Sequence, residues 1–170
     1  MKQGQQPARQ VERTQILAVD YGRVRIGLAI ADAATHMAKP LATLQRINRN
    51  EDMRRLRELV REHGVKQIVV GLPLRLDGTR GEMAEEAERF AQRAAKQIGV
   101  PVEMVDERLT SWEAERLMDE TFGRVSHKAD GAKGASTAGG ASVDAVAAAV
   151  ILKEYLERGR STEQGLGESE

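Results

Sequence analysis

Three carboxylates stand where an expected strand ends or an expected helix begins. Asp20 closes the apolar run 16–20, Glu107 follows the run 102–105, and Asp144 lies in the first turn of a C-terminal helix. Strand ends and helix starts at one edge of a sheet can converge on one point. Carboxylates about 4 Å apart repel by roughly 4 kcal/mol per pair at an effective dielectric constant near 20. A hard divalent cation removes that cost, so we expect these side chains to bind Mg²⁺ or Mn²⁺.

Two such ions about 3.5–4 Å apart could activate a water and stabilise the leaving oxygen in phosphodiester hydrolysis. Each acid also has an ordinary structural explanation. Asp20 could be a turn residue before Gly22, and Glu107 could be a solvated residue ahead of a helix. Asp144 could complement the helix dipole, which contributes about 0.3–1 kcal/mol. The case for a metal site therefore depends on the elements that surround the three acids.

Apolar runs and helical spacing define these elements. Short apolar runs predict strands at 16–20, 25–31, 40–44, 67–70 and 102–105. Apolar residues at helical spacing, with capping signals, predict helices at 51–63, 82–98, 110 to about 120, and 143–156. The stretch 123–141, rich in Gly, Ala and Ser, predicts a long loop.

The order of the elements predicts an α/β fold. The first three strands follow one another through short turns and should pair antiparallel, whereas the later strands alternate with helices and should add in parallel. We therefore expect a mixed five-stranded sheet flanked by helices in one domain, residues 16–157. The polar segments 1–15 and 158–170 are expected to be disordered tails.

Composition excludes several classes of protein. The chain has 170 residues, 26 basic and 26 acidic, so its zero formal net charge gives no argument for a nucleic-acid partner, and any basic surface must be local. It has no cysteine, which excludes disulfides and thiolate-bound metals and fits a cytoplasmic protein. No apolar stretch approaches the roughly 20 residues of a membrane helix, so no membrane association is expected.

Four segments carry a resemblance to a known family. They are DYGRVRIGLA at 20–29, VVGLPLRLDG at 69–78, DERLTS at 106–111 and VDAVAA at 143–148. In this order they resemble the YqgF/RuvX family of RNase H-like nucleases, which are described as Holliday junction resolvases. The resemblance implies an RNase H-like sheet of three antiparallel and two parallel strands. It also implies that Asp20, Glu107 and Asp144 are the catalytic and metal-binding acids.

The family further implies a substrate class without deciding between its two members. It is linked both to four-way DNA junctions and to 5′-end processing of pre-16S rRNA. The expected partner is therefore nucleic acid, branched DNA or pre-rRNA, cut with two Mg²⁺ or Mn²⁺ ions. Junction resolution needs paired cuts, so a homodimer would favour that substrate.

Basic and polar residues near the acids are candidates for substrate binding. They are Arg23, Arg25, Arg108, Thr110, Lys128 and Lys133. Each has an alternative: an exposed hairpin charge for the first two, pairing with a neighbouring acid for Arg108, and a helix cap for Thr110. The segment 131–140 is mostly small and neutral, whereas the family often has a more basic stretch there, so substrate contacts by this loop stay open.

Two other classes of function compete with the nuclease. The chain could be a non-catalytic nucleic-acid-binding module that keeps the fold, although the presence of all three acids argues against this. The D-x-G hairpin also occurs in actin-like sugar kinases and ATPases, which share a related core. Those proteins need two copies of that core to close over ATP, and 170 residues supply one.

Overall fold

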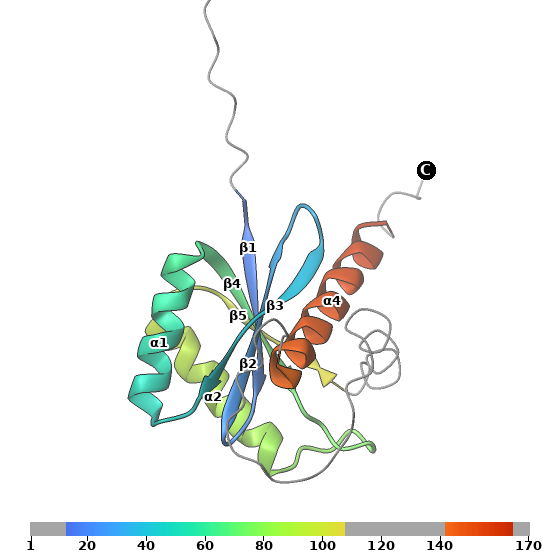
Figure 1. The fold of residues 1–170 in the computed structure, drawn as a ribbon. Helices are drawn as coiled ribbons and strands as arrows, with labels where there is room; N and C mark the ends of the chain where they lie inside the picture. Colours follow the sequence, from blue (N-terminus) through green and yellow to red (C-terminus); the bar gives the residue numbers. More distant parts are fainter. Residues whose placement is uncertain (1–12, 108–141, 165–170) are drawn as a thin grey trace, which may run out of the picture.

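A five-stranded mixed sheet organises the molecule (Figure 1). The computed structural model describes residues 13–107 and 142–164. The strands are β1 (Gln15–Tyr21), β2 (Arg25–Asp32), β3 (Met37–Gln45), β4 (Val65–Leu72) and β5 (Val102–Asp106), in the spatial order β3-β2-β1-β4-β5. The pairs β1–β2 and β2–β3 are antiparallel, and β1–β4 and β4–β5 are parallel. The expected sheet is thereby confirmed.

Helices cover both faces of the sheet. Figure 1 shows α1 (Arg49–Glu62) and α2 (Glu82–Ile98) on one face and α4 (Val143–Gln164) on the other. The strands run one to three residues past most of their expected ends, because ladder pairing continues into residues that are no longer apolar. Residues 158–164, expected to be part of a disordered tail, are helical, since α4 continues to Gln164. The helix expected at 110–120 and the loop 123–141 lie outside the described residues, as does most of the N-terminal tail.

Two apolar layers hold these helices to the sheet. On one face Leu17 and Val19 of β1 pack in a buried cluster with Leu56 of α1 and Phe90 of α2. On the other face the layer is built from smaller side chains, including Ala18 of β1, so that α4 can approach the strands closely. The two-residue alternation of β1 thus assigns each side chain to one layer.

The starts of α1 and α4 are fixed by side-chain caps. The Asn48 side chain accepts hydrogen bonds from the backbone N–H groups of Asn50 and Glu51 at the start of α1. The hydroxyl of Ser142 accepts from the N–H of Ala145 at the start of α4, over 3.2 Å. Within residues 13–107 and 142–164, none of the helices is both long and apolar enough to cross a membrane.

Candidate active site

Asp20 occupies the centre of the candidate site. It lies one residue before the end of β1 and pairs with Gly27 of the antiparallel neighbour β2. Its neighbours Val19 and Tyr21 belong to the layer under α1 and α2, so the alternation of the strand turns Asp20 towards α4. The carboxylate thus emerges at the edge of the sheet where the parallel strands β1, β4 and β5 end, as expected from the sequence.

Gly27 lets the N-terminus of α4 approach Asp20. A Cβ atom at this position would overlap the backbone carbonyl of Asp144. The start of α4 is also tied to the edge strand β3, because the hydroxyls of Thr43 and Ser142 form a hydrogen bond. Any residue larger than glycine opposite Asp20 would therefore push Asp144 away from the sheet edge.

Gly71 has the same role for Glu107 on the other side of Asp20. It follows Val70, which pairs with Val19 in the parallel ladder between β1 and β4. A Cβ atom at Gly71 would overlap the carboxylate of Glu107 and crowd the Ile151 side chain of α4. Two glycines on the strands that flank Asp20 thus leave room for the two other acids.

Burial and mutual repulsion perturb the central acids. Burial raises the pKa of Asp20 from 3.8 to about 6, and the negative charge of Asp144 contributes to the rise. Burial likewise raises the pKa of Glu107 from 4.5 to about 7, with repulsion from Asp20 and then Asp106 adding to it. Asp20 therefore lies close enough to both other acids to interact with them. The three acids predicted from the sequence are brought together at one sheet edge.

Arg25 occupies part of this acidic cluster. Its Nε donates to Asp144 Oδ2 over 2.8 Å, and both side chains are partly exposed to solvent. Among the described residues, no three His, Cys, Asp or Glu side chains are positioned as a ready set of metal ligands. The acids offer the oxygen donors that hard divalent cations prefer, in a place where their charges repel one another, so their chemistry fits such an ion. A three-acid ligand set nevertheless requires side chains to move.

Arg23 points to a different partner. Its guanidinium pairs with Glu86 of α2 over 2.8 Å and with Glu82 over 3.3 Å. The hydroxyl of Tyr21 donates to the same Glu86 over 3.3 Å. These contacts fasten the β1–β2 turn to α2, so the contacts of Arg23 favour its alternative as a structural charge of the hairpin.

A buried ion pair behind Asp20 was not predicted from the sequence. The Asp52 side chain is 3% exposed and accepts from Arg46 Nε over 3.0 Å and from the Ile47 N–H over 3.1 Å. Arg46 also donates to the Tyr21 hydroxyl over 2.8 Å and to the Gly22 carbonyl over 3.3 Å, and it lies over the Tyr21 ring. This cluster fixes the backbone that follows Asp20. In the sequence Arg46 belongs only to a group of basic residues, and no local pattern marks its partners.

The other four candidates fall outside the described residues. They are Arg108, Thr110, Lys128 and Lys133. Their assignment to the substrate stays a prediction from the sequence.

The fold is shared with solved nucleases of the RNase H-like class. The chain superposes on RuvC from T. thermophilus, solved in complex with a Holliday junction substrate, with a TM-score of 0.55 over 88% of this chain and 97% of RuvC. The two sequences are 15% identical, so this likeness concerns the fold alone.

Sequence relationships identify the family. The family model RuvX, described as Holliday junction resolvase, matches residues 14–158, and the chain belongs to this family. A relative from Anaeromyxobacter dehalogenans, provisionally named pre-16S rRNA nuclease, is 44% identical over 84% of this chain and 96% of its own length. A relative of the same name from Chloroflexus aurantiacus is 42% identical over 86% of this chain and 88% of its own. Both names, and the family description, are those of nucleases.

Proposed function

We propose that this protein is a metal-dependent endonuclease that hydrolyses phosphodiester bonds of structured nucleic acid at Asp20, Glu107 and Asp144. The observation that carries the proposal is the arrangement around Asp20, where Gly27 and Gly71 make room for the other two acids. A divalent cation would offset their mutual repulsion, and acids with perturbed pKa values that gather in this way are typical of functional sites. Membership in a family of nucleases supports the same reaction.

The proposed ligand set consists of the three acids. Asp20 interacts with both of the other acids, and the three carboxylates together would hold two Mg²⁺ or Mn²⁺ ions. Bound there, the ions would supply a nucleophilic water and stabilise the leaving oxygen. Partial burial of Asp20 and Glu107 strengthens every charge interaction at the site. The protein needs no histidine or lysine base for this reaction.

Arg25 is the described residue best placed to bind the substrate phosphate. It already pairs with an anionic oxygen at the site, that of Asp144, and a guanidinium can accept a phosphate in the same geometry. With Asp144 holding a cation, the Arg25 guanidinium would be free to bind a phosphate next to the acids. This gives Arg25, rather than Arg23, the substrate role among the residues after Asp20.

The substrate is either branched DNA or pre-16S rRNA in the cytoplasm. The family description names junction resolution, whereas the curated relatives carry the name of an rRNA nuclease. The 44% identity to a pre-16S rRNA nuclease favours the RNA over the junction, since the structural match to the junction-bound resolvase has only 15% identity.

Cleavage assays test the proposal directly. The purified protein is incubated with a four-way DNA junction and with a pre-16S rRNA fragment, each with Mg²⁺, with Mn²⁺ and with EDTA. We expect cleavage only with a divalent ion, and a loss of at least about a hundredfold in Asp20→Asn. The matched control is Asp32→Asn at the opposite end of the sheet, which should cut like the wild type. Equal rates for Asp20→Asn and wild type, or cleavage in EDTA, would refute the assignment.

A further inference from the structure

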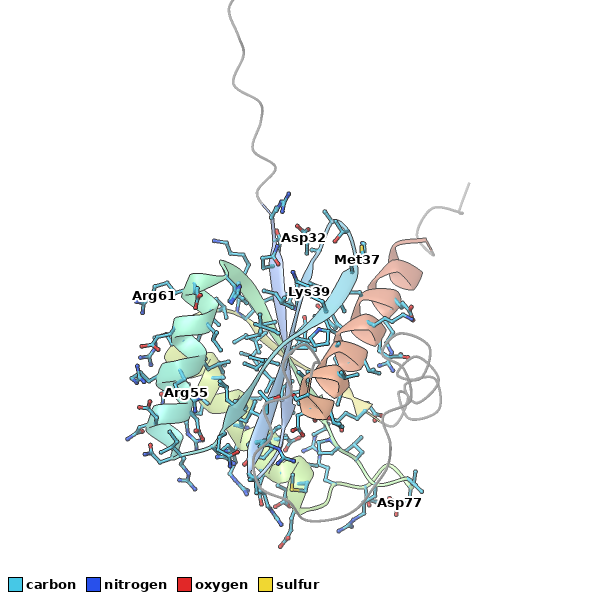
Figure 2. The ribbon with its side chains drawn as sticks, viewed as in Figure 1. Asp32, Met37, Lys39, Arg55, Arg61 and Asp77 are labelled. Atoms are coloured by element: carbon cyan, nitrogen blue, oxygen red, sulfur yellow. The ribbon has the colours of Figure 1, made fainter. Side chains whose placement is uncertain are left out.

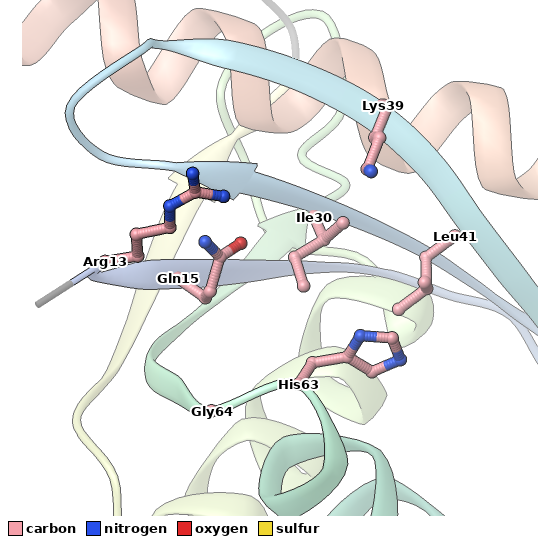
Figure 3. A pocket seen from close by; sticks show the side chains of 7 residues that line it. All are labelled: Arg13, Gln15, Ile30, Lys39, Leu41, His63 and Gly64. Carbon is pink, nitrogen blue, oxygen red and sulfur yellow. The ribbon is translucent and has the colours of Figure 1, made fainter. Parts of the chain in front are cut away.

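A pocket of about 300 Å³ lies at the end of the sheet opposite to Asp20 (Figure 3). It is formed by the beginning of β1, by β2 and β3, and by the turn that joins α1 to β4 at Gly64. Gln15 and Asp20 are five residues apart on β1, which corresponds to about 17 Å along the strand. A group bound in this pocket therefore cannot be the phosphate that is cut.

The pocket also lies on the opposite face of the sheet from the Asp20 side chain. Its apolar floor is made by Ile30 and Leu41, which belong to the layer under α1 and α2, whereas Asp20 faces α4. A molecule that contacted both places would have to pass around the edge of the sheet. The pocket is thus separate from the candidate active site.

Three basic side chains from separate segments surround this floor. Figure 3 shows Arg13 before β1, Lys39 on β3 and His63 after α1 around the pocket, and none of the lining residues in the described part of the chain is a carboxylate. Within the described residues neither Arg13 nor Lys39 has an ion-pair partner, in contrast to Arg23 and Arg25. We call the pocket lined by Arg13, Gln15, Ile30, Lys39, Leu41, His63 and Gly64 the distal basic pocket. Its Arg13 and Lys39 carry positive charges that are not part of an ion pair within the described residues.

Neighbouring groups offset only part of this charge. Asp32 lies beside Gln15 in the ladder, and its carboxylate, which accepts from the Gln15 amide over 3.4 Å and from the Ala34 N–H over 2.8 Å, contributes one formal negative charge. The end of α1 adds roughly half an elementary negative charge, and these two contributions together remain below the charge of Arg13 and Lys39. The excess favours an anionic ligand.

The lining suits a phosphate joined to an organic group. Arg13 offers forked donors and Lys39 a point charge, and the Gln15 amide and His63 ring add polar contacts that fit phosphate oxygens. Ile30 and Leu41 provide apolar surface for a sugar or base. A volume near 300 Å³ lies at the lower end of small-molecule sites and accommodates one nucleotide unit.

We propose that the distal basic pocket binds a phosphate of the nucleic-acid substrate at least about three nucleotides from the cut in an extended single strand, or at least about five at the 3.4 Å per nucleotide of a duplex strand. The proposal rests on the proposed function for the class of polymer. It gives the enzyme a second contact with its substrate, so that strands long enough to reach the pocket bind more tightly than short ones.

Binding to strands of two lengths tests this proposal. Fluorescence anisotropy in EDTA measures the Kd of single strands of about 20 and about two nucleotides, of which only the first can reach from Asp20 to the pocket. For the double variant Arg13→Ala/Lys39→Ala we expect roughly tenfold weaker binding of the long strand, a salt dependence lower by about one or two ions, and unchanged binding of the short strand. The matched control is Arg93→Ala/Lys96→Ala on α2, which removes the same charge elsewhere and should bind like wild type.

Two results would overturn the proposal. One is equal affinity of the double variant and the wild type for the long strand. The other is a combination of two measurements. Calorimetry would show that the wild type binds inorganic phosphate or a mononucleotide and that the double variant does not, while both proteins bind the long strand with the same affinity. Failure of the proposed function would look different: the wild type would bind the long strand through the pocket and yet cut neither candidate substrate with Mg²⁺ or Mn²⁺.

Discussion

Arg25 Nε donates to Asp144 Oδ2 over 2.8 Å, which places a fixed positive charge on one of the three acids of the candidate metal site. The guanidinium therefore competes with a cation for the same oxygen. Figure 2 shows Arg55 and Arg61 on α1, on the other face of the sheet from α4. Arg25 instead contacts Asp144 at the start of α4.

We predict that Arg25→Ala binds Mn²⁺ more tightly than the wild type and cuts nucleic acid more slowly. Removing a partly exposed positive charge beside Asp144 should favour the cation by about 1 kcal/mol, or roughly fivefold in Kd. Loss of the phosphate contact should lower kcat/KM by about tenfold or more. Calorimetry with Mn²⁺ and a cleavage assay measure the two effects.

Arg23→Ala provides the control for Arg25. It removes the same charge, but the Arg23 guanidinium pairs with Glu86 on α2, so Mn²⁺ affinity should change less than in Arg25→Ala. Weaker Mn²⁺ binding in Arg25→Ala would instead show that Arg25 holds Asp144 in position for the metal.

The raised pKa values of Asp20 and Glu107 predict an unusual pH dependence of stability. Folding raises these pKa values from 3.8 to about 6 and from 4.5 to about 7. Between about pH 4 and pH 7 the folded protein thus retains protons that the unfolded chain has lost, and the free energy of unfolding falls as pH rises through this window. The two shifts, of about 2 and about 2.5 pKa units at about 1.36 kcal/mol per unit, set an upper bound of about 6 kcal/mol on the stability that the metal-free protein loses from these groups by pH 8.

Urea denaturation at pH 5 and pH 8 in EDTA measures this loss. Asp20→Asn/Glu107→Gln should flatten the difference between the two pH values, because neither replacement titrates. Addition of Mg²⁺ at pH 8 should raise the stability of the wild type and leave the double variant unchanged. A wild type that gains stability between pH 5 and pH 8 in EDTA would contradict the assigned repulsion.

The sheet, and the place of the three acids at the ends of its elements, were predictable because their signals are local. The apolar runs of β1 and β2 and the position of Asp20 near a strand end are readable within a few residues. The partners of Arg23 were not predictable, because Glu86 lies 63 residues away and the pairing depends on how α2 packs. Asp52 likewise looks like an ordinary first-turn acid of α1 until Arg46 is placed beside it.

The roles of Gly27 and Gly71 were predictable only in part. Gly27 and Gly71 lie within segments that resemble the family, but the sequence alone does not say what approaches them. In the structure the obstacles are Asp144 and Glu107, which come from other parts of the chain. Sequence patterns thus point to the three acids, whereas the space that lets these acids approach one another is a tertiary property.

Gly27→Ala and Gly71→Ala should therefore differ in their effects. The Cβ of Gly27→Ala meets the backbone of α4 at Asp144, which cannot swing aside, so we expect a stability loss of about 1–3 kcal/mol. The Cβ of Gly71→Ala mainly displaces the carboxylate of Glu107, which can rotate, so we expect a smaller loss of stability but a cleavage rate lowered by about tenfold or more.

Gly159→Ala is the matched control for both glycine variants. Gly159 is exposed on α4, and a Cβ added there would meet nothing within 4 Å, so alanine should be neutral or stabilise by up to about 1 kcal/mol. Thermal denaturation and a cleavage assay on the three variants separate the effects. A fully active Gly71→Ala would show that cleavage does not depend on the observed position of the Glu107 carboxylate.

Asp52→Ala should destabilise the protein and loosen the turn after Asp20. The change leaves Arg46 and the Ile47 N–H without their buried acceptor, and removal of one partner of a buried pair costs about 3 kcal/mol. Because Arg46 also binds the Tyr21 hydroxyl and the Gly22 carbonyl, we expect weaker Mn²⁺ binding at Asp20 as well. Urea denaturation and calorimetry measure the two losses.

A double-mutant cycle with Tyr21→Phe separates packing from positioning. Tyr21→Phe removes only the hydroxyl that Arg46 and Glu86 share, while the ring keeps its contact with Phe90. If Asp52 acts on the site through Arg46 and Tyr21, the two changes should lower Mn²⁺ affinity by less together than the sum of their separate effects. Strict additivity in metal affinity, alongside the expected loss of stability, would restrict Asp52 to a structural role.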